Sequence, residues 1–192
     1  MKKLYLVRHG ETLFNKKKII QGACDSPLTE RGIQQALKVK KVLENVEIEG
    51  FYCSTQERAV DTLELILGQD KSYTRLKGLK ERNFGLFEGE REVLNPTWEN
   101  GYDEIFPLYG GETSDEVKIR VAKSIYQIIN KHNSALVVAH AGSIYHFLRY
   151  ALEKETLNEI MSTTKIPNCS IIELEYTDAG FEYKGITITD SH

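Results

Sequence analysis

Apolar residues along the chain fall into two kinds of short run. Residues 3–8, 51–54 and 134–140 are almost continuously apolar, as is typical of strands covered on both faces of a parallel sheet. Residues 169–176 and 181–188 instead alternate apolar and polar positions on either side of the turn sequence TDAG. The first three runs therefore predict a parallel sheet, and the last two predict a hairpin toward one edge of it.

Four longer segments carry the helical period. They span residues 28–46, 57–67, 113–132 and 142–152, and each lies between two of the predicted strands. Strands that alternate with helices predict an α/β fold, with a mostly parallel sheet and helices on both of its faces.

Capping residues and apolar stripes define two of these helices further. Thr29 is available as the N-cap of the first, and Thr113 with Glu116 predicts a capping box at the start of the third. The predicted stripes are Ile33, Ala36, Leu37, Lys40 and Leu43 in the first helix, and Val117, Val121, Ile125 and Ile128 in the third.

Composition describes an ordinary globular protein. The chain has 192 residues, of which 41% are hydrophobic and 28% charged, and we expect a single domain over residues 1–192. A formal net charge of −3 offers no basic field for nucleic acid, and no apolar stretch is long enough to cross a membrane. The consecutive Lys16, Lys17 and Lys18 are interpreted as a solvated end of a loop, with a local anion funnel as the alternative.

Cysteine usage and the N-terminus bear on the compartment. Cys24, Cys53 and Cys169 are odd in number and lack a CxxC pair or zinc-ligand spacing, so reduced thiols fit best. Arg8 ends the first apolar stretch too early for a signal peptide. We therefore expect a cytoplasmic protein, in which the sequon at Asn168 has no role in glycosylation.

Polar residues stand at the carboxyl ends of the three continuous strands. Arg8 and His9 end the first, Arg58 shortly follows the second, and His140 ends the third. Open parallel sheets bind ligands outside the carboxyl ends of their strands. Guanidinium groups match the tetrahedral oxygens of phosphate, so two arginines and two histidines at this edge predict a phosphate site.

These residue types indicate how the site would act on phosphate. An imidazole with one unprotonated nitrogen can attack phosphorus, which makes His9 the candidate nucleophile, and nearby arginines favour its neutral form. His140 can donate a hydrogen bond to a phosphoryl oxygen. The leaving alkoxide needs a proton, for which Glu81 is the first candidate and Glu88 the second. We assign the remaining histidines to structure or surface: His132, His146 and His192.

A set of ordered motifs resembles those of a known family. The motifs are VRHGET with Asn15, QGACDSPLTERG, CSTQERAVDT, LKERNFGLFEG, YGGET and VVAHAG, between residues 4 and 147. Together they are similar to the signatures of the histidine phosphatase superfamily, in its phosphoglycerate-mutase-like branch.

This resemblance implies a three-layer αβα sandwich, chemistry without a metal or other cofactor, and a covalent phosphohistidine on His9. It assigns Arg8, Arg58 and His140 to the phosphate pocket and Glu81 to proton donation. It places further phosphate or substrate contacts at Asn15, Gln21, Gly22 and the backbone of Gly142.

The branch contains both hydrolases and phosphoglycerate mutases, and the lid segment, residues 83–112, bears on the choice. A mutase has to hold a bisphosphorylated, carboxylate-bearing intermediate, which requires several cationic contacts. From Asn83 to Glu116 the chain has one basic residue, Arg91, and nine acidic ones, and it lacks the paired arginines and proline run of the mutases. The sequence therefore predicts a phosphatase that hydrolyses phosphate monoesters, with a phosphoglycerate mutase as the alternative.

Aromatic residues are frequent in the same lid segment. They are Phe84, Phe87, Trp98, Tyr102, Phe106 and Tyr109. They either wall a pocket for an uncharged or aromatic part of the substrate or form a small core of their own.

Three rival classes fit less well. A cysteine phosphatase needs one residue more than the four between Cys53 and Arg58, and a metal hydrolase would place a cation beside two arginines without an HExxH spacing. A non-catalytic phospholigand-binding protein needs neither His9 nor Glu81. The expected partner is a small-molecule phosphomonoester, not nucleic acid or a membrane, and a homodimer is an option that the sequence does not decide.

Overall fold

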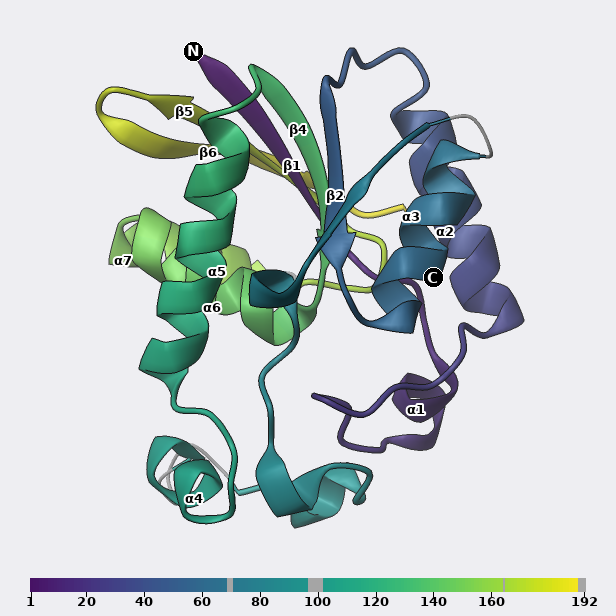
Figure 1. Ribbon diagram of the computed structural model, residues 1–192, viewed down its shortest axis with the longest axis vertical. Coiled ribbons are helices and arrows are strands. Elements are labelled where there is room, and N and C mark those ends of the chain that lie inside the picture. The colour runs from purple at the N-terminus through teal and green to yellow at the C-terminus, as the bar shows by residue number, and fades with distance from the viewer. Residues whose placement is uncertain (69–70, 97–101, 164, 190–192) are drawn as a thin grey trace.

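A six-stranded sheet with the order β3-β2-β4-β1-β5-β6 runs through the computed structural model, which describes residues 1–68, 71–96, 102–163 and 165–189 (Figure 1). The parallel strands are β1 (Lys2–Arg8), β2 (Gly50–Ser54), β3 (Thr74–Leu76) and β4 (Ser134–Ala139). The antiparallel strands β5 (Ile171–Thr177) and β6 (Gly180–Thr187) form a hairpin at one edge. The predicted α/β fold is confirmed, and so is the hairpin.

Helices cover both faces of the sheet and make three layers (Figure 1). One face carries α2 (Glu30–Val42) and α3 (Glu57–Leu67), and the other carries α5 (Ser114–Ile129), α6 (Ala141–Ala151) and α7 (Lys154–Thr163). In β1, Leu4 and Leu6 are buried in the core under α5 and α6, whereas Tyr5 and Val7 are buried under α2 and α3. A strand that fills two cores needs apolar residues at successive positions, which explains the continuous apolar runs.

The predicted helix caps are confirmed. Thr29 caps α2 by accepting a hydrogen bond from the Gly32 N–H, and Thr113 with Glu116 forms the capping box of α5. The apolar face predicted for α5 is buried at all four positions.

The stripe predicted for α2 is partly wrong. Leu37 is 40% exposed and Lys40 is also exposed, while Gln35 and Val39 are buried. Gln35 takes a core-facing position because its Oε1 accepts a hydrogen bond from the Glu11 N–H at 2.9 Å. A polar contact of this kind leaves no trace in hydrophobic periodicity.

Several short elements complete the fold without having been predicted. They are α1 (Leu13–Lys17), α4 (Tyr102–Leu108), the 3₁₀ turns η1 (Lys77–Leu79), η2 (Gly85–Phe87) and η3 (Glu92–Leu94), and also β3 and α7. Apart from α7 they have three to seven residues, which is shorter than the window in which a periodic pattern shows. Figure 1 shows that α1, η2 and α4 lie beyond the carboxyl ends of the parallel strands. These short elements therefore lie at the edge of the sheet where β1 ends at Arg8 and where His140 follows β4.

Candidate active site

His9 directly follows β1, and its ring is 4% exposed. Its Nδ1 lies 2.8 Å from the carbonyl oxygen of Gly10. A carbonyl oxygen only accepts hydrogen bonds, so Nδ1 carries the proton and Nε2 keeps its lone pair. Burial, followed by the positive charges of Arg58 and Arg8, lowers the pKa of His9 well below its ordinary value. His9 is thus a neutral imidazole with an available nucleophilic nitrogen.

His140 directly follows β4 and is fully buried, with its ring centroid 5.2 Å from that of His9. Arg58 Nε donates a hydrogen bond to His140 Nδ1 at 3.1 Å, which leaves the ring proton on Nε2. Among the described residues this Nε2 has no hydrogen-bond partner. Burial, followed by Arg58 and His9, lowers the pKa of His140 well below its ordinary value. The two rings therefore hold opposite tautomers, one with a free lone pair and one with a free N–H.

Arg58 is fully buried in the first turn of α3 and is held by the loop at residues 22–25. Its Nη1 donates to Asp25 Oδ1 at 2.8 Å and to the Cys24 carbonyl at 2.9 Å, and its Nη2 donates to the Gly22 carbonyl at 2.9 Å. The carbonyl of Gly22, a residue predicted to contact phosphate or substrate, accepts from Arg58. This loop fixes the guanidinium that in turn fixes the tautomer of His140.

Arg8, the last residue of β1, contributes a second cation. Its Nη1 donates to the Ile166 carbonyl at 2.8 Å, and its Nε is buried without a partner among the described residues. Burial lowers the pKa of Arg8 from its ordinary value. Buried donors without acceptors are rare in proteins, so Arg8 Nε and His140 Nε2 fit a site in which a ligand supplies oxygen atoms.

Glu81, in the loop that follows η1, lies beside the N-terminus of α6, the helix that begins directly after His140. Its carboxylate accepts hydrogen bonds from the N–H groups of Arg82, Gly142 and Ser143, each at 2.9 Å. The Gly142 N–H, which was expected to be open to phosphate, is therefore occupied by Glu81. The arrangement places the proposed proton donor and His140 at the same helix terminus.

Glu88, the second candidate acid, has a different environment. Its carboxylate accepts hydrogen bonds from the N–H groups of Gly22, Ala23, Cys24 and Phe84, at 2.7 to 3.1 Å. Four backbone donors from two segments make it a clamp that ties the loop at residues 22–24 to the lid segment.

Asn15 contacts the site through Asn168, and Gln21 contacts Arg58 directly. Asn15 Oδ1 accepts from Asn168 Nδ2 at 3.2 Å, and the same Nδ2 donates to the His9 carbonyl at 2.9 Å. With its amide oxygen toward Arg58, Gln21 shares the Arg58 Nε–H with His140 Nδ1, at 2.9 Å from Nε, and donates to Thr12 Oγ1 at 2.8 Å. Both residues lie in the hydrogen-bonded frame around the two histidines and Arg58.

Sequence reasoning missed several members of this frame. Asp25 holds Arg58, Asn168 holds His9, and Thr62 accepts a hydrogen bond from the Gly10 N–H at 3.0 Å. Gln56 bonds the Gly22 carbonyl and also accepts from the Glu81 N–H at 2.8 Å. Asp25, Gln56 and Thr62 lie inside the quoted motifs, which gave a signal, whereas Asn168 was considered only as a sequon.

The lid aromatics form a small core around Phe106, which is fully buried. Phe84 and Phe87 pack edge to face against it, with centroids 5.0 and 5.4 Å away, and the Arg82 guanidinium lies 5.0 Å from its ring. Trp98, Glu99 and His192 lie outside the described residues, as does the side chain of Tyr102.

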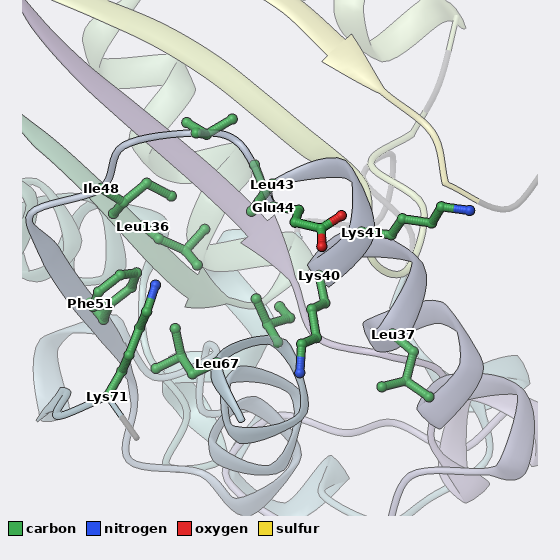
Figure 2. A pocket seen from close by; sticks show the side chains of 12 residues that line it. Leu37, Lys40, Lys41, Leu43, Glu44, Ile48, Phe51, Leu67, Lys71 and Leu136 are labelled. Atoms are coloured by element: carbon green, nitrogen blue, oxygen red, sulfur yellow. The ribbon is translucent and has the colours of Figure 1, made fainter. Parts of the chain in front are cut away.

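A cavity of about 480 Å³ lies on the face of the sheet that α2 and α3 cover, and Figure 2 shows the side chains that line it. Phe51 and Leu136 form its floor, and Lys71 Nζ lies 4.8 Å from the centroid of the Phe51 ring. These two floor residues pair near the beginnings of β2 and β4. The cavity is thus distant from the histidines, which follow the ends of their strands.

Two absences hold for the described part of the chain. Its helices are too short or too polar to cross a membrane. Its His, Cys, Asp and Glu side chains nowhere come together in a group of three that could hold a metal ion.

A buried, neutral histidine beside a second histidine and two arginines, at the carboxyl edge of an αβα sheet, is typical of a class of phosphoryl-transfer proteins. The chain belongs to the histidine phosphatase superfamily (branch 1), whose family model matches residues 4–189. The resemblance seen in the sequence is confirmed.

The names of individual relatives in this superfamily describe different reactions. Fructose-2,6-bisphosphatase TIGAR B of Danio rerio is 36% identical over 148 residues, which are 69% of this chain and 57% of that protein. This chain therefore spans little more than half the length of that relative. A 2,3-bisphosphoglycerate-dependent phosphoglycerate mutase of Porphyromonas gingivalis is 26% identical over 225 residues, covering 93% of this chain and 88% of the mutase.

A solved structure is similar over almost its full length. It is a mutant phosphoserine phosphatase from Entamoeba histolytica in complex with phosphoserine, with a TM-score of 0.82, 28% identity and 98% coverage of each chain.

Proposed function

We propose that this protein is a phosphatase that hydrolyses phosphate monoesters in two steps through a phosphohistidine on His9. The observation that carries the proposal is the pair of opposite tautomers, His9 with a free Nε2 lone pair and His140 with a free Nε2–H, in rings 5.2 Å apart. A nucleophile and a donor to the phosphoryl oxygens are what the first step requires.

In the first step, His9 Nε2 attacks phosphorus and the bond between phosphorus and the ester oxygen breaks. The departing alkoxide takes a proton from Glu81, while Arg8, Arg58 and His140 stabilise the charge on the phosphoryl oxygens. In the second step, water attacks the phosphohistidine, gives a proton to Glu81, and the P–N bond breaks. Inorganic phosphate leaves and His9 is again neutral.

Charge in the lid supports hydrolysis over the alternative mutase reaction. Arg82 and Arg120, two of the cations that contact the lid from outside it, are bonded to Asp103 at 2.9 Å and to Glu112 at 2.7 Å. Cations bonded in this way are not free to hold the second phosphate and the carboxylate of a mutase intermediate. A phosphoglycerate mutase remains the second candidate because such an enzyme is among the relatives.

We also propose a single domain over residues 1–192, a small-molecule phosphomonoester as substrate and a location in the cytoplasm. The location is supported by Cys24, Cys53 and Cys169, because none of these three cysteines forms a disulfide. A homodimer is an option that size-exclusion chromatography with light scattering decides.

Replacement of the nucleophile tests the reaction. Wild-type protein, assayed with an aryl phosphate in the presence of a strong chelator, is expected to release phosphate, and His9→Ala to lose at least about a thousandfold in kcat/KM. Wild type quenched during turnover should carry an acid-labile phosphoryl group that His9→Ala lacks. His132→Ala is the matched control, because His132 bonds Tyr52 at 2.8 Å at the opposite end of β2.

Two results would contradict the proposal. Undiminished turnover by His9→Ala excludes His9 as the nucleophile. Interconversion of phosphoglycerate isomers without net release of phosphate identifies a mutase.

A further inference from the structure

A second cavity, which we call the α6–α7 cavity, lies beside the proposed phosphate site. Its volume is about 360 Å³. Its lining includes Phe84, Tyr145, His146, Leu157, Met161 and Ile166. A mainly apolar cavity of this size with a few polar groups is typical of sites for small molecules.

Some residues that line this cavity also contact the proposed catalytic site. Gly142 lines the cavity, and its N–H donates to the Glu81 carboxylate at 2.9 Å. Ile166 also lines the cavity, and its carbonyl accepts from Arg8 Nη1 at 2.8 Å. The cavity therefore begins between the proposed proton donor and a cation of the phosphate site, which is where the departing alcohol has to be.

The charged side chains in the described lining of the α6–α7 cavity are those of Arg82 and Lys165, and neither is a free buried cation. Arg82 is 1% exposed and donates to Asp103 Oδ1 at 2.9 Å and to the Glu112 carbonyl at 2.8 Å. Lys165 is exposed, so its ammonium group is hydrated. The described lining contains neither Asp nor Glu. A second anionic group on a substrate would meet one hydrated lysine and no free buried cation.

His146 adds a polar but uncharged group. It is 4% exposed, and its Nδ1 has no hydrogen-bond partner within the described part of the chain. Burial, followed by the charge of Arg82, lowers the pKa of His146 to about 4, so the ring is neutral near pH 7. A neutral imidazole offers one donor and one acceptor, which suits a hydroxyl group better than an anion.

We infer that the α6–α7 cavity is the subsite for the non-phosphate part of the substrate, and that it selects an uncharged, mainly apolar alcohol able to bond His146. This inference rests on the proposed phosphatase function. The preferred substrates are monophosphates of such alcohols. A carboxylate or a second phosphate on the alcohol is disfavoured, because it would lose its hydration without gaining a buried cation.

Three esters of primary alcohols test this selectivity: n-hexyl phosphate, glycerol 3-phosphate and 3-phosphoglycerate. Their leaving groups are all primary alkoxides, so differences in kcat/KM report recognition of the alcohol. We expect wild type to favour n-hexyl phosphate over glycerol 3-phosphate by about tenfold or more, and to use 3-phosphoglycerate least well.

Substitutions at Met161 assign the preference to the cavity. Met161→Gln is expected to lower kcat/KM for n-hexyl phosphate about tenfold and to leave that for glycerol 3-phosphate unchanged. Met161→Lys is expected to raise kcat/KM for 3-phosphoglycerate. Ile119→Gln is the matched control, because Ile119 is 64% exposed on α5 and the same kind of change there should alter neither ester. Thermal unfolding checks that each variant is folded, and if the Met161 variants are not, the order of the three esters in wild type decides.

The possible failures are distinguishable. If wild type hydrolyses none of the three esters and no aryl phosphate, the phosphatase function fails and the subsite with it. The subsite alone is overturned if wild type hydrolyses the three esters without preferring n-hexyl phosphate. It is also overturned if Met161→Gln lowers kcat/KM equally for n-hexyl phosphate and glycerol 3-phosphate.

Discussion

Arg58 connects most of the residues that make the site reactive. One guanidinium bonds His140 and three oxygen atoms of the loop at residues 22–25, and its charge helps to keep His9 neutral. The cation that we propose to bind phosphate therefore also fixes the proton position in His140, whereas the Gly10 carbonyl fixes that in His9. Residues that hold Arg58 should influence catalysis without touching the substrate.

Asp25 provides the test at the residue scale. It accepts from Arg58 Nη1 at 2.8 Å, and its side chain is 22% exposed. A hydrogen bond to a charged group contributes about 1.5–3 kcal/mol, so Asp25→Ala is expected to lower kcat/KM by roughly tenfold to a hundredfold, mainly through kcat. Steady-state kinetics measure the split between kcat and KM.

Asp25→Asn should recover part of the activity, because an amide oxygen can still accept from Arg58. Asp178→Ala, in the exposed turn between β5 and β6, is the control and should leave kcat/KM as it is. A normal kcat in Asp25→Ala would show that Arg58 keeps its position without this ion pair.

At the scale of elements, the acidic lid segment is held by specific contacts. Asp103 bonds Arg82 and Ser114, and Glu112 bonds Arg120. Burial alone would raise the pKa of Glu112, but hydrogen bonds from Arg120 and the Asn83 N–H lower it. The negative charge counted in the sequence is therefore partly neutralised by arginines that lie just outside the counted segment.

Glu88 is the contact that joins the lid to the loop holding Arg58. Glu88→Ala leaves four backbone N–H groups without their acceptor, and we expect it to lower the free energy of unfolding by about 2 kcal/mol and kcat/KM severalfold. Urea denaturation and steady-state kinetics measure the two effects. Glu90→Ala, two residues away and exposed, is the matched control. Equal effects of both substitutions would argue against the clamp.

Sequence reasoning was strongest where chemistry and hydrophobic pattern coincide. Arg8, His9 and His140 end continuous apolar strands, and the strand direction alone puts them on one edge of the sheet. It was weakest for backbone contacts, since nothing in the residue types of Gly22 or Gly142 shows that their peptide groups bond Arg58 and Glu81. The stripe predicted for α2 left out Gln35 for the same reason, because the buried position of Gln35 depends on one hydrogen bond.

For the molecule as a whole, buried neutral histidines predict how stability depends on pH. The pKa values of His9, His140 and His146 are all lowered by burial, whereas an unfolded histidine titrates at about 6.5. Above that pH the folded and unfolded states bind the same number of protons on these residues. Below it the unfolded state takes up protons first, so each histidine lowers the free energy of unfolding by up to about 1.4 kcal/mol per pH unit.

Denaturation curves between pH 7.5 and pH 4.5 measure this loss. For His146 the loss should continue until pH approaches its folded pKa of about 4, so His146→Leu is expected to flatten the dependence of stability on pH. A slope that is the same with and without His146 would mean that this ring becomes protonated in the folded protein.

The strand order has a consequence for how the protein is made. β4 lies between β1 and β2, which do not pair with each other. Arg8, His9 and Arg58 are therefore synthesised long before β4, the strand that brings them together. A nascent or truncated chain that ends before Ser134 contains the proposed nucleophile His9 but lacks His140, so we expect activity only after β4 has inserted between β1 and β2.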